Sequence, residues 1–224
     1  MAKNKTNAPI IFRSIEARIR DLLTLPSPTN LFDSLAHAQA LLLYQIIRLF
    51  DGDITARSSA EQLIPSLENA ALQLLTYVRF DDHLSSKPDL PLYPIQPIKD
   101  IWEDWIVQES ARRTVLVTFY FLQAYRVLSG HVGLQCDGKL GLCHSWTLSS
   151  KLWDAGTTVE FAQAWKARQY YVVTNGQFAQ VLQEAKAEDV DSFGRIWISS
   201  LLGIEETEGW FAARGGKLQM EMAR

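Results

Sequence analysis

IWEDWIVQESARRTVLVTFYFLQAY, residues 101–125, has the pattern of one long helix in which charged residues interrupt an apolar sequence. Each residue of an α-helix advances by about 100° around the helix axis. This spacing places Trp102, Glu109 and Arg113 on a single stripe together with Ile106 and Leu116. Glu109 and Arg113 are four positions apart and are therefore neighbours on the apolar face of the predicted helix. The interpretation of the fold depends on why a core helix carries charge there.

Three roles are open for these charges: a buried structural lock, a catalytic or anion-binding site, and a solvated charged face of the helix. Charges buried in a core must be paired and hydrogen-bonded, and removing one partner typically costs about 3–5 kcal/mol. We therefore expect a structural lock, a buried cluster that holds the central helix, made of Trp102, Trp105, Glu109, Arg112 and Arg113. The alternative makes Glu109 an acid or base and uses the two arginines to bind an anionic substrate. That chemistry needs a second titrating group nearby, and the sequence indicates none.

Apolar spacing predicts further helices on both sides of this stretch. Residues 30–50 have the three-or-four spacing of an amphipathic helix, with Asn30 as the expected N-cap. The apolar positions of that helix are Leu31, Leu35, Ala38, Leu42, Ile46 and Leu49. A second helical segment over 54–78 should be kinked or divided at Pro65.

Prolines and glycines mark the expected boundaries in the rest of the chain. Four prolines in residues 81–99 predict a loop, which the central helix follows from about Asp100 to Leu128. After a glycine-rich break, shorter helices are expected at roughly 157–173, 175–185, 188–202 and 205–213.

These patterns predict an all-α protein, an irregular bundle of about seven to nine helices. No series of alternating, β-branched segments at regular spacing indicates a sheet-based fold. We expect a single helical domain over 30–214, preceded by an N-terminal extension over 1–29. Residues 81–99 form its proline-rich loop, and 215–224 form a C-terminal tail.

The composition limits the possible partners. The chain has 224 residues, 47% of them hydrophobic, which is enough for a substantial core. Its formal net charge of −3 gives no general attraction to nucleic-acid phosphates. Two cysteines fit a reducing compartment, and no stretch has the roughly 18 uninterrupted apolar residues of a membrane span. We therefore expect neither a membrane segment nor direct DNA binding by this chain alone.

Candidate metal ligands gather in the glycine-rich break. Cys136 and Cys143 lie close to His131 and His144, and thiolates with imidazoles suit zinc. Their spacing is not one of the usual closed zinc arrangements, so we expect no metal and no other cofactor. The acidic segment RFDDHLSSKPD, residues 79–89, is similar to a metal–diphosphate motif of helical prenyl-transferring enzymes, but no second carboxylate cluster accompanies it.

Catalytic motifs are missing from the sequence. It contains no glycine-rich phosphate loop, nucleophile elbow, H-E-x-x-H motif or dinucleotide fingerprint. Four scattered histidines do not define a Ser-His-Asp triad by their spacing. The sequence therefore does not support an enzyme.

Aromatic residues of the second half of the chain have two interpretations. Large rings at helix-packing positions fill a core as readily as they line a pocket. Core packing is the expected role of most of them. A surface for a small-molecule effector or a partner protein is the alternative, and its candidates are Trp146, Trp153, Trp165, Tyr170 and Tyr171.

The segment WEDWIVQESARRTVLVTF, residues 102–119, resembles a W-x-x-W-I-x-x-E-S-x-R-R-T segment in the regulatory region of fungal zinc-cluster transcription factors. Residues 35–68, LAHAQALLLYQIIRLFDGDITARSSAEQLIPSLE, resemble the helix pair that precedes that segment. Residues 150–165, SKLWDAGTTVEFAQAW, and 188–210, EDVDSFGRIWISSLLGIEETEGW, are similar to the family's later helices. The resemblance thus extends over most of the chain.

This resemblance implies an all-helical regulatory domain that controls a metabolic or secondary-metabolite gene cluster, located in the nucleus or in both cytoplasm and nucleus. Full-length members carry a zinc cluster of six cysteines for DNA binding, which this sequence does not contain. The expected partner is therefore a protein, such as a DNA-binding regulator or a co-activator, and self-association into a homo-oligomer stays open. Two alternatives are a small helical ligand-binding protein or enzyme of a biosynthetic pathway, and a truncated regulator whose DNA-binding half is encoded elsewhere.

Overall fold

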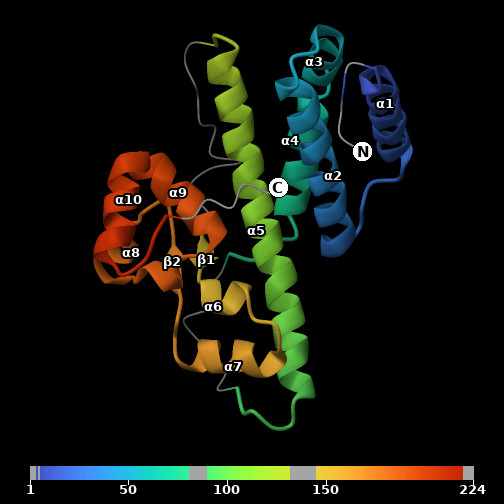
Figure 1. Ribbon diagram of the computed structural model, residues 1–224. Helices are drawn as coiled ribbons and strands as arrows, with labels where there is room; N and C mark the ends of the chain where they lie inside the picture. The colour runs from blue at the N-terminus through green and yellow to red at the C-terminus, as the bar shows by residue number, and fades with distance from the viewer. Residues whose placement is uncertain (1–3, 5, 81–89, 132–144, 219–224) are drawn as a thin grey trace. The chain divides into compact units, whose positions relative to one another are not determined.

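The computed structural model describes residue 4 and residues 6–80, 90–131 and 145–218. These residues form ten α-helices, a short 3-10 helix and a sheet of two strands. The α-helices and strands are labelled in Figure 1. The prediction of an all-α, multi-helix fold is confirmed. The chain divides into two compact units, Met1–Arg79 with Ser110–Gly141 and Phe80–Glu109 with Leu142–Arg224. The expected single domain over 30–214 stays a prediction.

The first unit contains four complete helices, and helix α5 contributes its C-terminal part. Their bounds are α1 Ala8–Thr24, α2 Leu31–Phe50, α3 Ile54–Glu61, α4 Ile64–Leu75 and α5 Gln96–Leu128. Helix α2 packs against α1, α3 and α4 (Figure 1). The buried side chains of α2 include Leu35, Ala38, Leu42 and Leu49, as the apolar spacing predicts.

Local signals explain the helix boundaries in this unit. The side chain of Asn30 accepts the backbone N–H of Asp33 at 2.9 Å, which confirms the predicted N-cap of α2. Pro65 lies in the first turn of α4, where a missing N–H is harmless, so it divides the 54–78 segment into two helices as predicted. Helix α1 lies inside the expected N-terminal extension and buries Phe12 and Ile19.

Helix α5 begins earlier than the sequence indicated. It begins at Gln96 rather than near Asp100, because Pro97 occupies the first turn and removes no helical hydrogen bond there. The end of the expected 81–99 loop is therefore helical, while residues 81–89 lie outside the described residues. The predicted end at Leu128 is confirmed.

The second unit combines short helices with two short strands. After the N-terminal part of α5 come β1 Trp146–Leu148, α6 Ser150–Trp153, α7 Thr158–Lys166, β2 Tyr171–Val173, α8 Ala179–Glu184, the 3-10 helix Ala187–Asp189, α9 Ser192–Leu202 and α10 Ile204–Ala213. Strands β1 and β2 pair antiparallel, with Trp146 opposite Val173 and Leu148 opposite Tyr171. The core of this unit includes buried Ile98, Trp105, Leu152, Phe161 and Trp165.

The helix expected over 157–173 is wrong in its second half. Helix α7 ends at Lys166, and Arg168 then has a positive φ of 54°, a conformation that ends a helix. Residues 171–173 pair with β1, and this partner is distant in the sequence. Two other predicted helices begin later than expected, at Ala179 and at Ser192. In the described part of the chain, no helix has the length and apolar character needed to cross a membrane.

Gly194 lies where α9 approaches β1. A Cβ atom built on Gly194 would lie 2.8 Å from Cδ1 of Leu148 and 3.0 Å from Cγ1 of Val190. Both distances are too short for carbon atoms in contact, and Leu148 is itself fully buried. A side chain at position 194 would therefore force Leu148 to move or α9 to shift away from β1.

We expect Gly194→Ala to lower the free energy of unfolding by about 1–3 kcal/mol, because the added methyl group overpacks the core. Gly209→Ala is the matched control, since no atom lies within 4 Å of a Cβ built at this α10 position. That control should stabilise the protein by up to about 1 kcal/mol through helix propensity. Chemical denaturation measures both changes, and equal stability of the two variants would contradict the close approach of α9 to β1.

Candidate functional site

Glu109 is a buried charged residue of the second unit. Its side chain is fully buried, and Oε1 accepts the backbone N–H of Thr147, in β1, at 2.9 Å. A buried strand donor without an acceptor would destabilise the fold, and a carboxylate is a strong acceptor for it. Glu109 therefore joins helix α5 to strand β1.

The two tryptophans of the expected lock lie in the core of the same unit. Trp105 is buried and Trp102 is half-buried, and both contact Phe161 of α7, with ring centroids 5.4 Å and 6.0 Å away. Trp105 also meets Trp153 of α6 edge-on at 6.5 Å. Aromatic pairs at such distances add to the energy of burial. These rings hold α5 against α6 and α7.

The two arginines of the expected lock belong to the first unit. Arg113 is buried, and Arg112 donates from Nη1 to the backbone carbonyl of Arg79 at 2.7 Å. The pairing of Glu109 with Arg113 and the combined role of the five residues stay predictions.

The five candidate residues for an effector or partner surface differ in exposure. Trp146 and Trp165 are buried, whereas Trp153, Tyr170 and Tyr171 are half-buried. Trp165 contacts the rings of Phe161 and Tyr170 at 5.5 Å and 5.8 Å. Their role in effector or partner contact stays a prediction.

Most of the candidate metal ligands lie outside the part of the chain that the structure describes. Cys136, Cys143 and His144 lie outside the described residues, and His131 is exposed. Within the ranges that the structure describes, no three His, Cys, Asp or Glu side chains gather as a metal site would require.

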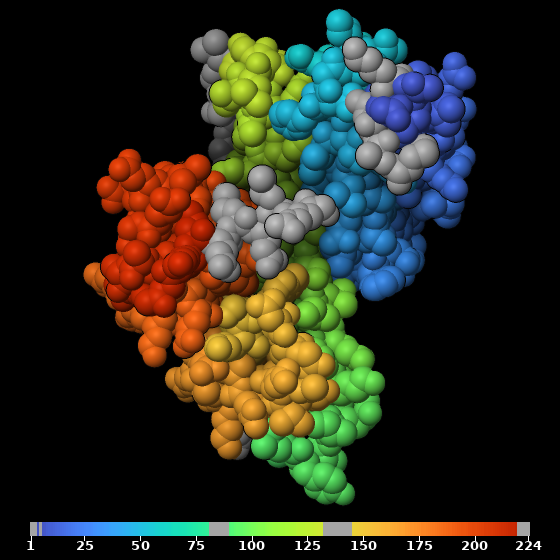
Figure 2. Space-filling model, viewed as in Figure 1, coloured from blue at the N-terminus to red at the C-terminus, as the bar shows by residue number. Residues whose placement is uncertain are grey.

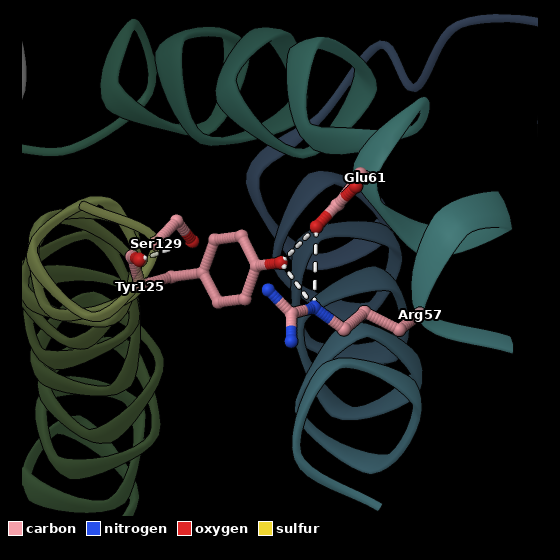
Figure 3. A network of polar contacts seen from close by, with 4 residues as sticks. All are labelled: Arg57, Glu61, Tyr125 and Ser129. Carbon is pink, nitrogen blue, oxygen red and sulfur yellow. Dashed lines mark hydrogen bonds and ion pairs between the residues drawn. The ribbon is translucent and has the colours of Figure 1, made fainter. Parts of the chain in front are cut away.

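A polar network in the first unit links α3 to the end of α5 (Figure 3). The Tyr125 hydroxyl donates to Oε1 of Glu61, and Nε of Arg57 donates to the same carboxylate at 3.3 Å and to the Tyr125 hydroxyl at 3.1 Å. The Ser129 hydroxyl donates to the Tyr125 carbonyl at 2.7 Å. Sequence reasoning missed this network, because Tyr125 is 64 positions from Glu61 and 68 from Arg57.

Each charge of the network stabilises the other. The Tyr125 hydroxyl, and then the Arg57 guanidinium, lower the pKa of Glu61, and the pKa of Arg57 is raised by its hydrogen bonds to Tyr125 and Glu61. A carboxylate with a lowered pKa is ionised at neutral pH and can keep its hydrogen bonds to Tyr125 and Arg57. The network therefore connects helices, as does the ion pair of Arg126 with Glu68 of α4.

Helix α2 also carries a second apolar face, which is exposed over most of its length and contacts the rings of Phe121 and Tyr125 of α5 through Phe50. We call this set the outer face of α2: Phe32, Leu43, Ile46, Ile47 and Phe50. Phe32 and Phe50 are 67% and 51% exposed, and atoms of α2 form part of the surface shown in Figure 2. Ile46 was expected in the core but is exposed and belongs to the outer face. Both faces of α2 are apolar, so the apolar spacing did not show that the buried stripe lies on the face opposite Ile46. A helix that is apolar all round usually has partners on every side.

We expect Glu109→Ala to lower the free energy of unfolding by at least about 1–3 kcal/mol, because the N–H of Thr147 would lose its acceptor inside the core. The control is Glu103→Ala on the same helix, where an exposed carboxylate lies 3.6 Å from Lys99. Loss of that pair should change stability by no more than about 1 kcal/mol. Thermal and chemical denaturation compare the variants, and an unchanged stability of Glu109→Ala would rule out a structural role for this carboxylate.

We expect Tyr125→Phe to raise the pKa of Glu61 toward its ordinary value, because the hydroxyl is the largest cause of its lowered pKa. A folded-state pKa below the unfolded-state value stabilises the protein above the unfolded value, and this stabilisation disappears as pH falls through the folded value. Tyr125→Phe should therefore lose stability at neutral pH and approach the parent protein in acid.

NMR titration of the Glu61 side chain and denaturation at neutral and acidic pH measure these two effects. Tyr93→Phe serves as the control, because Tyr93 is 88% exposed and should show neither. A Glu61 titration that is the same in Tyr125→Phe and in the parent chain would contradict the assigned hydrogen bond.

Comparison with known proteins relates the chain to a transcription factor. The chain is 29% identical over 211 residues to the transcription factor gsfR2 of Penicillium aethiopicum. The alignment covers 93% of this chain and 49% of that protein, so the chain spans about half the length of the relative that it matches. No protein-family model matches the chain, and no solved structure does. The chain is thus related to a fungal transcription factor over most of its length.

Proposed function

We propose that this chain is a transcription-regulatory domain that acts through a protein partner. The observation that carries the proposal is the similarity to a transcription factor over 93% of the chain. The resemblance of residues 102–119 to the regulatory region of zinc-cluster factors supports a regulatory role for the matched part. In this role the chain works in the nucleus and controls a metabolic or secondary-metabolite gene cluster.

The charge of the chain favours a protein partner over DNA. A formal net charge of −3 provides no electrostatic attraction to phosphates, on which the affinity of DNA-binding proteins depends. A DNA-binding regulator or a co-activator that holds the chain at a promoter would supply that contact. The proposed role of the chain is to change the transcription that such a partner directs.

The outer face of α2 supports this role as a binding surface. Its five apolar side chains lie on one side of a single helix, which is the arrangement that an amphipathic helix of a partner recognises. Leu43 and Ile47 lie one turn apart at its middle and are 58% and 44% exposed. Truncating side chains at the centre of a protein interface usually causes the largest loss of binding free energy.

The proposal is tested by joining the whole chain to an unrelated DNA-binding domain and measuring a reporter gene in a fungal host. We expect expression to differ several-fold from that produced by the DNA-binding domain alone. The double variant Leu43→Gln/Ile47→Gln should reduce this effect while keeping the thermal stability of the parent chain, because both side chains are exposed.

Arg13→Gln/Arg18→Gln is the matched control, since both arginines are exposed on α1 and away from the outer face of α2. It should leave the reporter unchanged. A tethered parent chain with no effect on the reporter would overturn the proposed function. A reporter effect that is unchanged in Leu43→Gln/Ile47→Gln would support the proposed function but would exclude the outer face of α2 as the binding surface.

A further inference from the structure

A pocket in the first unit, open to solvent and called the cavity below, lies among helices α1, α2 and α3. Its volume is about 330 Å³, at the lower end of the range of small-molecule sites. Its lining includes Glu16, Ile19, Arg20 and Leu23 of α1, Arg48 of α2 and Ser59 of α3. The polar and apolar side chains of this lining have no role in the function proposed above.

Arg48 is the unusual member of this lining. Its side chain is 1% exposed, and Nη2 donates to the Ser59 hydroxyl at 2.6 Å. Within the described residues, Nε and Nη1 of Arg48 are buried and have no hydrogen-bond partner. A guanidinium stays charged in proteins, and a buried charge with unused donors destabilises the fold unless an anion compensates it.

Glu16 compensates this charge only in part. Burial lowers the pKa of the Arg48 guanidinium, and the Glu16 carboxylate opposes that effect from the same cavity. No hydrogen bond or ion pair joins the two side chains in the part of the chain that the structure describes. With Arg20 at the same cavity, the lining carries two positive charges and one negative charge.

The remaining side chains of the lining indicate which class of ligand the cavity can bind. Ile19 is buried, and Leu23 adds a second apolar side chain to the lining. Inorganic phosphate would leave this apolar part of the cavity unused, and a dianion would exceed the single net positive charge. An organic monoanion fits both the charge and the apolar surface.

We propose that this cavity binds a small organic carboxylate, whose apolar body contacts Ile19 and Leu23 and whose carboxylate accepts hydrogen bonds from Arg48. Ser59 holds the Arg48 guanidinium through Nη2, which leaves Nε and Nη1 as the donors for the ligand. Glu16 repels the ligand and limits its affinity. The site belongs to the chain itself and does not depend on a role in transcription.

The test is isothermal titration of the purified full chain with sodium benzoate at low ionic strength. Benzoate should bind at one saturable site and raise the melting temperature. Benzyl alcohol has the ring without the charge, and acetate has the charge without the ring. Both should bind at least about tenfold more weakly, because benzyl alcohol lacks the carboxylate and acetate lacks the apolar ring.

Two substitutions with opposite effects separate this site from nonspecific binding. Arg48→Met should weaken benzoate binding at least about tenfold by removing the guanidinium donors. Glu16→Gln should instead tighten it, at least about threefold, by removing the repelling charge. Arg18→Gln is the control on α1, because Arg18 is exposed and outside the lining, and it should have no effect.

Arg48→Met removes a buried side chain, so its folding is checked by circular dichroism. If it does not fold, Glu16→Gln and the NMR shift of the Ile19 methyl groups on adding benzoate decide the matter. Absence of benzoate binding would overturn the proposal, and the cavity would then hold only water. Binding that Glu16→Gln fails to tighten, or that leaves the Ile19 methyl shifts unchanged, would also overturn it.

Discussion

The hydrogen bond from the Thr147 N–H to the buried carboxylate of Glu109 is the constraint on which the second unit depends. It fixes β1 beside α5, and β1 in turn is the partner of β2. Directly after β1, the Ser149 hydroxyl caps α6 by accepting the N–H of Leu152 at 3.0 Å and donates to the Gln169 carbonyl at 2.6 Å. One buried acceptor thus begins a series of contacts that positions α6 and the segment before β2, which explains why a charge occurs in the apolar face of α5.

The sequence allowed the helices with strong local signals to be predicted. Helix α2 followed from its apolar spacing and from Asn30, and the division between α3 and α4 followed from Pro65. The strands could not be predicted, because each has only three residues and its stabilising partner is distant in the chain. The end of α7 was missed for a different reason: Arg168 takes the positive φ of a Schellman motif, in which the Gln169 N–H donates to the Ala164 carbonyl at 3.1 Å, and this position usually carries a glycine that would have indicated the helix end.

The polar sites were predictable to different degrees. The burial of Glu109 and Arg113 followed from the helical stripe that they share with apolar residues. The contact of Arg57 with Tyr125 joins residues 68 positions apart and has no signal in a single sequence. Arg48 did have a signal, because helical spacing places it on the same side of α2 as buried Leu41 and Gln45. An arginine on a core face indicates either a buried acceptor or a ligand.

Glu109 and Arg48 show how hydrogen bonding separates structural from binding roles for buried charges. Glu109 accepts a backbone donor within its own unit, and such a satisfied charge stabilises one arrangement of helix and strand. Arg48 lies beside a cavity with donors left over after its contact with Ser59. Glu16 compensates the buried charge in part, and a bound anion would compensate the rest, so binding and folding are linked at this site. A regulator built on this fold would thereby possess a means to respond to a metabolite without any change in its core.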